Sequence, residues 1–195
     1  WRGFILKKIV KIGLSGAAVL GVFLSPLPNF VQVSQPTTTV QAATKYKFKK
    51  GVAKIHDLKI KINKVKFLKP SDTDEHNRIV FEYTITNKTN KDIDAITGWQ
   101  AVFNAYQKNK NTEGQLEVGS TPNGYDDELK NQSQKINKGG SVNGVTVYNL
   151  DSTTTPVVLK ASQGIDGKKI GQKTYKIGEF QEEKPLNLDS DSSAE

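Results

Sequence analysis

The segment Arg78-Ile79-Val80-Phe81-Glu82-Tyr83-Thr84-Ile85-Thr86-Asn87-Lys88 has the clearest secondary-structure pattern in the chain. Its apolar residues alternate with a second, mostly polar set: Ile79, Phe81, Tyr83 and Ile85 against Val80, Glu82, Thr84 and Thr86. A two-residue period rich in β-branched and aromatic types is typical of a β-strand with one face in a core. We therefore predict a β-sheet protein in which this segment is a central strand with an apolar face and an ordinary second face.

The segments on either side of this strand also alternate. Residues 52–68 place lysines between apolar residues, but the apolar phase slips by one residue at Asn63-Lys64. A slip of this kind predicts either a bulge or two short strands. Residues 44–51 alternate lysine with aromatics and form either a first edge strand or a mobile N-terminus. Residues 99–107 predict a second well-patterned strand, with Trp99 buried in the core.

Further strands are predicted at residues 142–150, 156–161 and 173–178, each bounded by turn residues. The connection from Lys108 to Lys138 is long for a structureless loop, so we expect at least one short element within it. No segment has a convincing amphipathic helical pattern. Short strands separated by turn signals predict an all-β protein with an antiparallel β-sandwich.

The first 42 residues have the order of a secretory signal peptide. A segment with four basic residues and no acid precedes an apolar run of about 13 residues, which is too short to span a bilayer as a helix. Small residues at Val40 and Ala42 predict cleavage after Ala42. The alternative is an uncleaved N-terminal anchor, which would be the protein's one contact with a membrane.

The remaining chain is divided by charge. Residues 43–178 are large enough for one domain with an ordinary core, and the absence of cysteine excludes disulfides. Lys45 to Lys69 contain ten lysines and one acid, Asp57. Residues 179–195 hold six acids and one lysine, and we predict a disordered acidic tail there.

The lysines of residues 52–68 form the candidate binding surface. The predicted strand alternation turns one row of them away from the core: Lys59, Lys61, Lys64 and Lys66. Exposed lysines commonly protect a sheet against edge-to-edge pairing, and this is the simpler interpretation. The alternative is a face that binds an anionic ligand. Nucleic acid is not expected, because nucleic-acid modules usually combine arginine with stacking aromatics.

The residues available for catalysis are few. The chain has no cysteine, and its two histidines, His56 and His76, lack zinc-site spacing. The first acidic cluster, Asp72, Asp74 and Glu75, lacks the glycine and terminal glutamate of an EF-hand, so a solvated loop is favoured over Ca²⁺ binding. The second, residues 126–128, is typical of a helix N-terminus or turn. We expect no enzymatic activity, cofactor or metal.

Several strand ends and turns resemble a known family. These are Phe81 to Lys88, Tyr106-Gln107, Lys138 to Ser141, Tyr148 to Asp151 and Thr155 to Val157. Together, over about residues 50–178, they resemble a domain-of-unknown-function family of secreted or surface proteins of low-GC Gram-positive bacteria. More distantly, they are similar to the telokin-like and immunoprotective extracellular antigen group. The resemblance implies an immunoglobulin-like antiparallel β-sandwich of about seven strands, and it implies no catalytic residues. Many members carry a leader cysteine, which this chain lacks.

Together these observations predict an exported, non-enzymatic immunoglobulin-like module, secreted or retained at the cell wall. We expect a monomer whose partner is a protein or an anionic cell-wall polymer, with Lys59, Lys61, Lys64 and Lys66 as the contact face. One alternative is a secreted hydrolase that uses the loop carboxylates Asp72, Asp74, Asp126 and Asp127. Another is a structural spacer of an exported complex.

Overall fold

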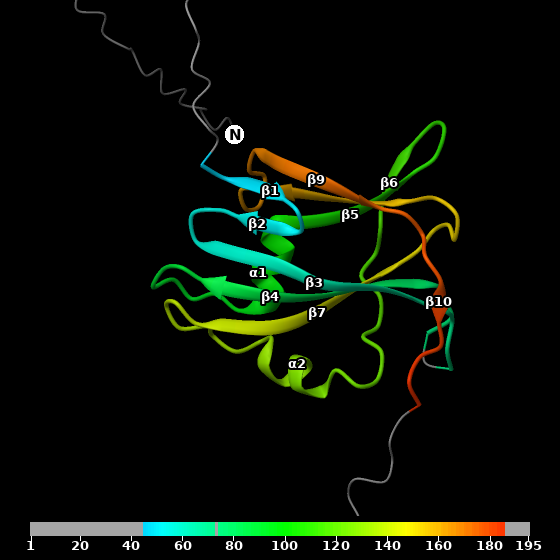
Figure 1. Cartoon of the computed structure of the whole chain (residues 1–195), viewed down its shortest axis with the longest axis horizontal. Helices are drawn as coiled ribbons and strands as arrows, with labels where there is room; N and C mark the ends of the chain where they lie inside the picture. The colour runs from blue at the N-terminus through cyan, green and yellow to red at the C-terminus, as the bar shows by residue number, and fades with distance from the viewer. Residues whose placement is uncertain (1–44, 73, 186–195) are drawn as a thin grey trace, which may run out of the picture. The chain divides into compact units, whose positions relative to one another are not determined.

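The computed structural model describes residues 45–72 and 74–185. The predicted signal peptide, and the part of the predicted tail that follows residue 185, lie outside these residues. The described residues belong to one unit, Ala42–Glu195. They form two β-sheets and two short helices (Figure 1).

The larger sheet has the strand order β1-β2-β3-β4-β7, and all of these neighbours are antiparallel. The strands are β1 (Lys47–Lys49), β2 (Val52–Lys54), β3 (Leu58–Leu68), β4 (Arg78–Asn87) and β7 (Ser141–Asn149). A further strand, β10 (Phe180–Gln181), pairs in parallel with the end of β3. Because β4 pairs along the other edge of β3, β10 occupies the edge that the short β2 leaves open.

The smaller sheet has the strand order β6-β5-β8-β9, again antiparallel throughout. Its strands are β5 (Phe103–Lys108), β6 (Glu113–Gln115), β8 (Val157–Ser162) and β9 (Lys169–Tyr175). Helix α2 (Asp126–Asn131) contacts β7 of the larger sheet (Figure 1). β6 and α2 confirm the prediction of short elements between Lys108 and Lys138.

Strand β4 is central, as its sequence predicts, because it pairs with β3 on one side and β7 on the other. Its predicted core face is 0% exposed at all four positions, Ile79, Phe81, Tyr83 and Ile85. The prediction of an ordinary second face is wrong. Val80 on that face is also 0% exposed and packs in a second apolar cluster with Leu68, Tyr125, Val145 and Val147. The segment around α2 therefore gives β4 a core on both sides.

The phase slip predicted near Asn63 is a bulge within one long strand. The register between β3 and β4 shifts between Ile62 and Lys64. Residues 44–51 were expected to form either a first edge strand or a mobile N-terminus. They contain β1, which is an edge strand of the larger sheet.

The predicted strand at residues 99–107 is wrong in its first half. Residues Ala95–Val102 form helix α1, and the strand β5 begins only at Phe103. The Asp94 side chain caps the helix by accepting a hydrogen bond from the Thr97 backbone N–H at 2.8 Å. Gly98 permits close packing, since a Cβ there would lie 2.3 Å from Cδ1 of Ile85. The helix buries residues 95, 98, 99 and 102, and this spacing is typical of one face of a helix. In the sequence, the strand-like alternation over residues 99–105 hides this helical spacing.

The core is centred on Trp99, which is 0% exposed, as predicted. Its ring centroid lies 4.4 Å from that of Tyr83 and 4.6 Å from that of Phe103. The indole N–H donates to the hydroxyl of Tyr148 at 2.9 Å. Tyr83 on β4 and Phe103 on β5 belong to opposite sheets, so Trp99 links the two layers.

The predicted fold class, an antiparallel β-sandwich, is confirmed. The described residues hold ten strands rather than about seven, because several are only two or three residues long. They also hold two helices: α1, which the sequence did not predict, and α2, which begins where residues 126–128 were expected to be a helix N-terminus or turn. No helix within the described ranges is long and apolar enough to cross a membrane.

Candidate functional site

The most distinctive surface is formed by lysines on β1, β2 and β3. Lys47 stands opposite Lys54, and Lys54 stands opposite Lys59, so three lysines form one row across three strands. A second row contains Lys49 and Lys61 on either side of Val52. The residues in the row between them are buried, which turns the lysines to solvent. We call this surface the lysine face; it comprises Lys47, Lys49, Lys50, Lys54, Lys59, Lys61 and Lys64, all exposed.

None of these seven lysines forms an ion pair with another described residue. Asp57, the one acidic residue between Lys45 and Lys69, pairs instead with Lys91 at 2.8 Å and with His56. Hydrogen bonds from Lys91 and His56 lower the pKa of Asp57. The lysine face therefore presents a positive charge that no acid within it balances.

The face is hollowed at the β1–β2 hairpin. An open depression of about 360 Å³ is lined by five lysines and one apolar residue: Lys47, Lys49, Lys50, Lys54, Lys59 and Val52. Its lining contains no acidic residue. An anion in the depression would therefore have ammonium groups around it and no carboxylate to repel it.

Three of the four lysines predicted as the contact face belong to the lysine face, namely Lys59, Lys61 and Lys64. Lys66 lies on the same side of β3 but is half-buried, and its ammonium group pairs with Glu82 and donates to the Tyr125 hydroxyl at 2.8 Å. Burial alone would lower the pKa of Lys66, but the bonds to Glu82 and Tyr125 raise it. Its charge is therefore already compensated within the fold.

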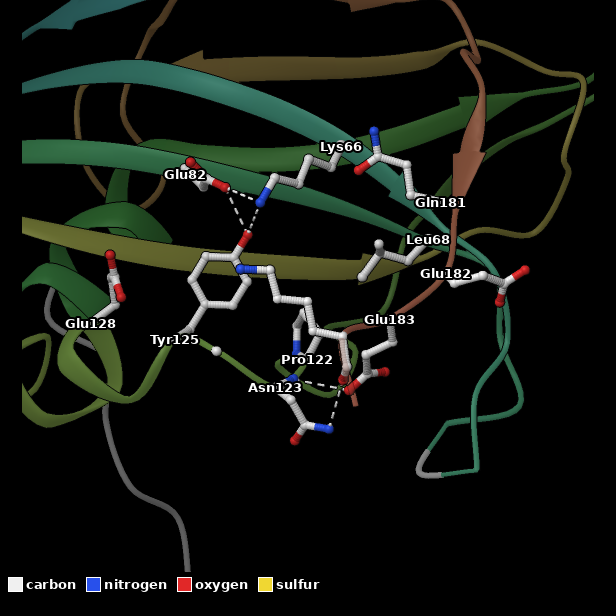
Figure 2. A pocket seen from close by; sticks show the side chains of 12 residues that line it. Lys66, Leu68, Glu82, Pro122, Asn123, Tyr125, Glu128, Gln181, Glu182 and Glu183 are labelled. Atoms are coloured by element: carbon white, nitrogen blue, oxygen red, sulfur yellow. Dashed lines mark hydrogen bonds and ion pairs between the residues drawn. The ribbon is translucent and has the colours of Figure 1, made fainter. Parts of the chain in front are cut away.

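Figure 2 shows this second environment, where Lys66, Glu82 and Tyr125 point toward one another. The Tyr125 hydroxyl donates to the Glu82 carboxylate at 2.7 Å. They line a pocket of about 270 Å³ that residues 122–124, α2 and the segment after β10 also border. Burial opposes ionisation of Glu82, but the Lys66 ammonium and the Tyr125 hydroxyl lower its pKa. Burial raises the pKa of Tyr125. The three groups stabilise one another in their ordinary charge states, so none is prepared for proton transfer near neutral pH.

Beside this pocket lies a buried arginine. Arg78 is 0% exposed, and its guanidinium donates to the Glu183 carboxylate at 2.6 Å and to the Ser120 carbonyl at 3.2 Å. It also lies 3.8 Å from the Asp74 carboxylate. We call this group the Arg78 clasp; it comprises Arg78, Asp74, Glu183, Ser71 and Ser120.

The clasp corrects the prediction of disorder for residues 179–185, the described part of the predicted acidic tail. Phe180 and Gln181 form β10, and Glu183 is held by Arg78, by the Asn123 backbone N–H at 2.9 Å and by the Ser71 hydroxyl at 2.7 Å. The composition of the segment is acidic and polar, but a buried arginine gives one of its acids a specific partner. The ordered domain extends beyond residue 178 for this reason.

The predicted carboxylate sites are dispersed. Asp74 belongs to the clasp, Asp72 is exposed on the β3–β4 connection, and Asp126 and Asp127 are exposed on the first turn of α2. Burial opposes ionisation of Asp74, but hydrogen bonds from His76 and Ser120 lower its pKa to about 2. Within residues 45–72 and 74–185, no group of three or more His, Asp or Glu side chains is placed to hold a metal ion.

The sequence predicted three of the seven lysines of the lysine face and missed the other four. Lys47, Lys49, Lys50 and Lys54 join it only because the β1–β2 hairpin folds against β3. The alternation of lysines with Tyr46 and Phe48 was the available signal. The sequence contains a weaker indication of the Arg78 clasp, namely that Arg78 is the only arginine after residue 42.

The fold and its surfaces define a two-sheet β-sandwich module with an exposed cationic face. The chain belongs to the family described as Domain of unknown function (DUF5067), whose model matches residues 33–163. This confirms the family predicted from the strand-end and turn motifs.

Solved structures of Gram-positive proteins share the fold. One is described as "a putative lipoprotein from Staphylococcus aureus subsp. aureus NCTC 8325"; it is 20% identical, with a TM-score of 0.63, over 71% of this chain and 96% of that one. A second, the protein from Enterococcus faecalis, is 16% identical, with a TM-score of 0.55, over 68% and 94% of the two chains. Comparison with curated proteins gives no match.

Proposed function

We propose that this protein is an exported, non-enzymatic module that binds an anionic component of the bacterial cell wall through the lysine face. The observation that carries the proposal is the arrangement of the seven exposed lysines. Lys54 stands directly opposite Lys47 and Lys59 across strands, which is destabilising, and none of the seven lysines forms an ion pair with a described residue. A ligand that supplies the missing negative charge would relieve that repulsion.

Protection of a sheet edge does not account for this arrangement. β1 is an edge strand, so Lys47 and Lys49 fit that role. β2 and β3 are internal in the region of Lys54, Lys59 and Lys61, where hydrogen bonds on both sides already prevent further strand pairing. Repeated lysines on internal strands favour a contact surface over an edge device.

A binding role is favoured over catalysis by the ionisation of the described side chains. Each carboxyl with a shifted pKa is shifted downward, and each shifted tyrosine upward, with burial raising the pKa of Tyr148 and of Tyr175 to about 12. General acids and bases work best with a pKa near the operating pH. The candidate carboxylates of a hydrolase, Asp72, Asp74, Asp126 and Asp127, are dispersed, and Asp74 is already engaged.

Export is supported by the sequence order of residues 1–42, which is that of a secretory signal peptide. The Staphylococcus aureus protein of the same fold is described as a putative lipoprotein, a class of protein held outside the cell membrane. A cationic module in that location meets wall polymers with repeated anionic groups, and its positive field favours their approach.

The test is co-sedimentation of residues 43–195 with purified Gram-positive cell walls. We expect binding at low salt that weakens at least about tenfold near 0.5 M salt, where the Debye length falls to about 4 Å. The triple variant Lys54→Gln, Lys59→Gln, Lys61→Gln should reduce binding strongly. The matched control, Lys110→Gln, Lys130→Gln, Lys138→Gln, changes the net charge equally at exposed lysines outside the face and should bind nearly as well.

Two results would contradict the proposal. One is wall binding that does not depend on salt. The other is an equal loss of binding in the two triple variants, which would mean that net charge alone matters.

A further inference from the structure

The turn between β1 and β2 has a residue that its backbone does not favour. Lys50 and Gly51 connect Lys49 to its cross-strand partner Val52, and they have φ values of 52° and 75°. Two consecutive positive φ values are typical of a type I′ hairpin turn, in which Asn-Gly is strongly preferred. A lysine in the left-handed region is disfavoured by contact between its Cβ and the backbone. The turn chemistry therefore favours Asn at position 50, and the chain has Lys.

The Lys50 side chain lines the depression of the lysine face. Lys47 and Lys49 precede it on β1, and Lys54 and Lys59 line the other side from β2 and β3. The left-handed backbone at residue 50 thus adds a fifth ammonium group to a site already lined by four. A substitution to Asn would keep the turn and remove that group.

The kind of cation indicates the kind of anion. Arginine binds carboxylate through a planar fork with fixed geometry, whereas lysine acts as a compact point charge with three donors. The depression contains lysine and no arginine. Several ammonium groups can donate to the non-bridging oxygens of one phosphate without fixing its orientation. This suits the phosphate groups of a flexible chain.

The size of the face indicates a polymer. Neighbouring strands lie about 4.8 Å apart, so the row Lys47, Lys54, Lys59 spans about 10 Å across the sheet. Lys61 and Lys64 extend the positive surface along β3 beyond the depression. One phosphate would fill the depression only, whereas a chain of phosphates could continue over the rest of the face.

We propose that the β1–β2 hairpin is a phosphate cradle, in which Lys50 and the four lysines around it hold a phosphate group of a linear phosphate polymer. The inference rests on the proposed function. It adds the class of ligand, a linear phosphate polymer, and a residue that contacts this ligand, Lys50. Lys50 is kept at the cost of an unfavourable turn position because it contacts the ligand.

The deciding variant is Lys50→Asn, for which we expect effects of opposite sign. The Tm of residues 43–195 should rise by about 1–3 °C, because Asn-Gly suits the turn. The affinity for linear inorganic polyphosphate of defined length should fall about three- to tenfold. Lys110→Asn, at an exposed lysine on another connection, is the matched control and should leave that affinity unchanged.

The ligand class is tested by four probes measured at one salt concentration: polyphosphate, orthophosphate, polyglutamate of similar charge, and vesicles containing anionic phospholipid. We expect polyphosphate to bind most tightly of the four. Equal binding of polyglutamate would overturn phosphate recognition, and preference for the vesicles would overturn the polymer. Either result leaves salt-dependent wall binding standing.

The role of Lys50 has its own contrary outcomes. A higher Tm with unchanged polyphosphate affinity would overturn it. If Lys50→Asn instead lowers both Tm and affinity, the turn itself is damaged, and Lys54→Gln decides, since it leaves the turn intact. Unchanged polyphosphate affinity in Lys54→Gln would then overturn the cradle.

Discussion

The lysine face and the Arg78 clasp are both rich in charge, but they hold that charge in different ways. The seven lysines of the face are exposed and form no ion pair with a described residue. In the clasp, Arg78 is 0% exposed, and both carboxylates near it have side chains that are 6% exposed. The face thus has charge that the fold does not use, and the clasp has charge on which the fold depends.

The two regions differ because the lysine face is exposed to solvent and the Arg78 clasp is buried. Water and salt screen the repulsion among exposed lysines, so the face can carry uncompensated charge at little cost in stability. A buried arginine without a carboxylate would lose its hydration and gain nothing in return. Charge at the face is therefore free to serve a partner, whereas charge in the clasp must be paired within the chain.

The largest expected effect is at Arg78. Arg78→Met should lower the free energy of unfolding by about 3–5 kcal/mol, because it leaves Asp74 and Glu183 as buried carboxylates without their cation. Urea denaturation of residues 43–195 at neutral pH measures the loss. Adding Glu183→Gln should recover part of it, since that change removes one of the two uncompensated charges. A loss below about 1 kcal/mol would show that the clasp does not hold the C-terminal segment.

Acid should weaken the clasp and spare the face. Asp74 has a folded-state pKa of about 2, and the Arg78 guanidinium and hydrogen bonds from Asn123 and Ser71 outweigh burial and lower the pKa of Glu183. A lowered folded-state pKa gives stability that is present above the unfolded pKa, near 4, and is lost as pH falls through the folded value.

We therefore expect the Asp74 contribution, about 1–2 kcal/mol, to be lost between roughly pH 5 and pH 2. Urea denaturation across that range measures it. Asp74→Asn should flatten the profile, whereas Lys61→Gln should leave its shape unchanged, since Lys61 lies outside the clasp. An equal profile in Asp74→Asn and the parent protein would exclude Asp74 as the source.

How far the sequence predicts these regions depends on the range of the contacts. β4 and its buried inner face follow from alternation between neighbouring residues, and local pattern predicted them; the same pattern limited the irregularity in β3 to a bulge or a break into two short strands. α1 was missed because Trp99, Ala101, Phe103 and Ala105 alternate as in a strand, while the packing of Trp99 against both sheets stabilises a helix.

The site residues divide in the same way. Lys59, Lys61 and Lys64 share a side of one strand, so local alternation found them. Lys66 was placed on the correct side, but its ammonium group is held by Glu82 on the neighbouring strand and by Tyr125, a residue 59 positions away in the sequence. The contact between Arg78 and Glu183 spans 105 residues and joins an apolar strand to an acidic segment. Composition alone gives no signal for one buried pair of that kind.

The smallest expected effect is on the stability of the lysine face. Lys54→Gln, Lys59→Gln, Lys61→Gln should leave the free energy of unfolding unchanged or raise it by up to about 0.5 kcal/mol, because like charges opposite one another are removed. Urea denaturation at low salt and at about 0.5 M salt separates the cause, since a gain from relieved repulsion should vanish when salt screens it. A loss above about 1 kcal/mol would mean that these lysines serve the fold through their aliphatic stems, and the contrast with Arg78 would fail. An unchanged or higher stability together with lost wall binding is the pattern expected of residues retained for a partner.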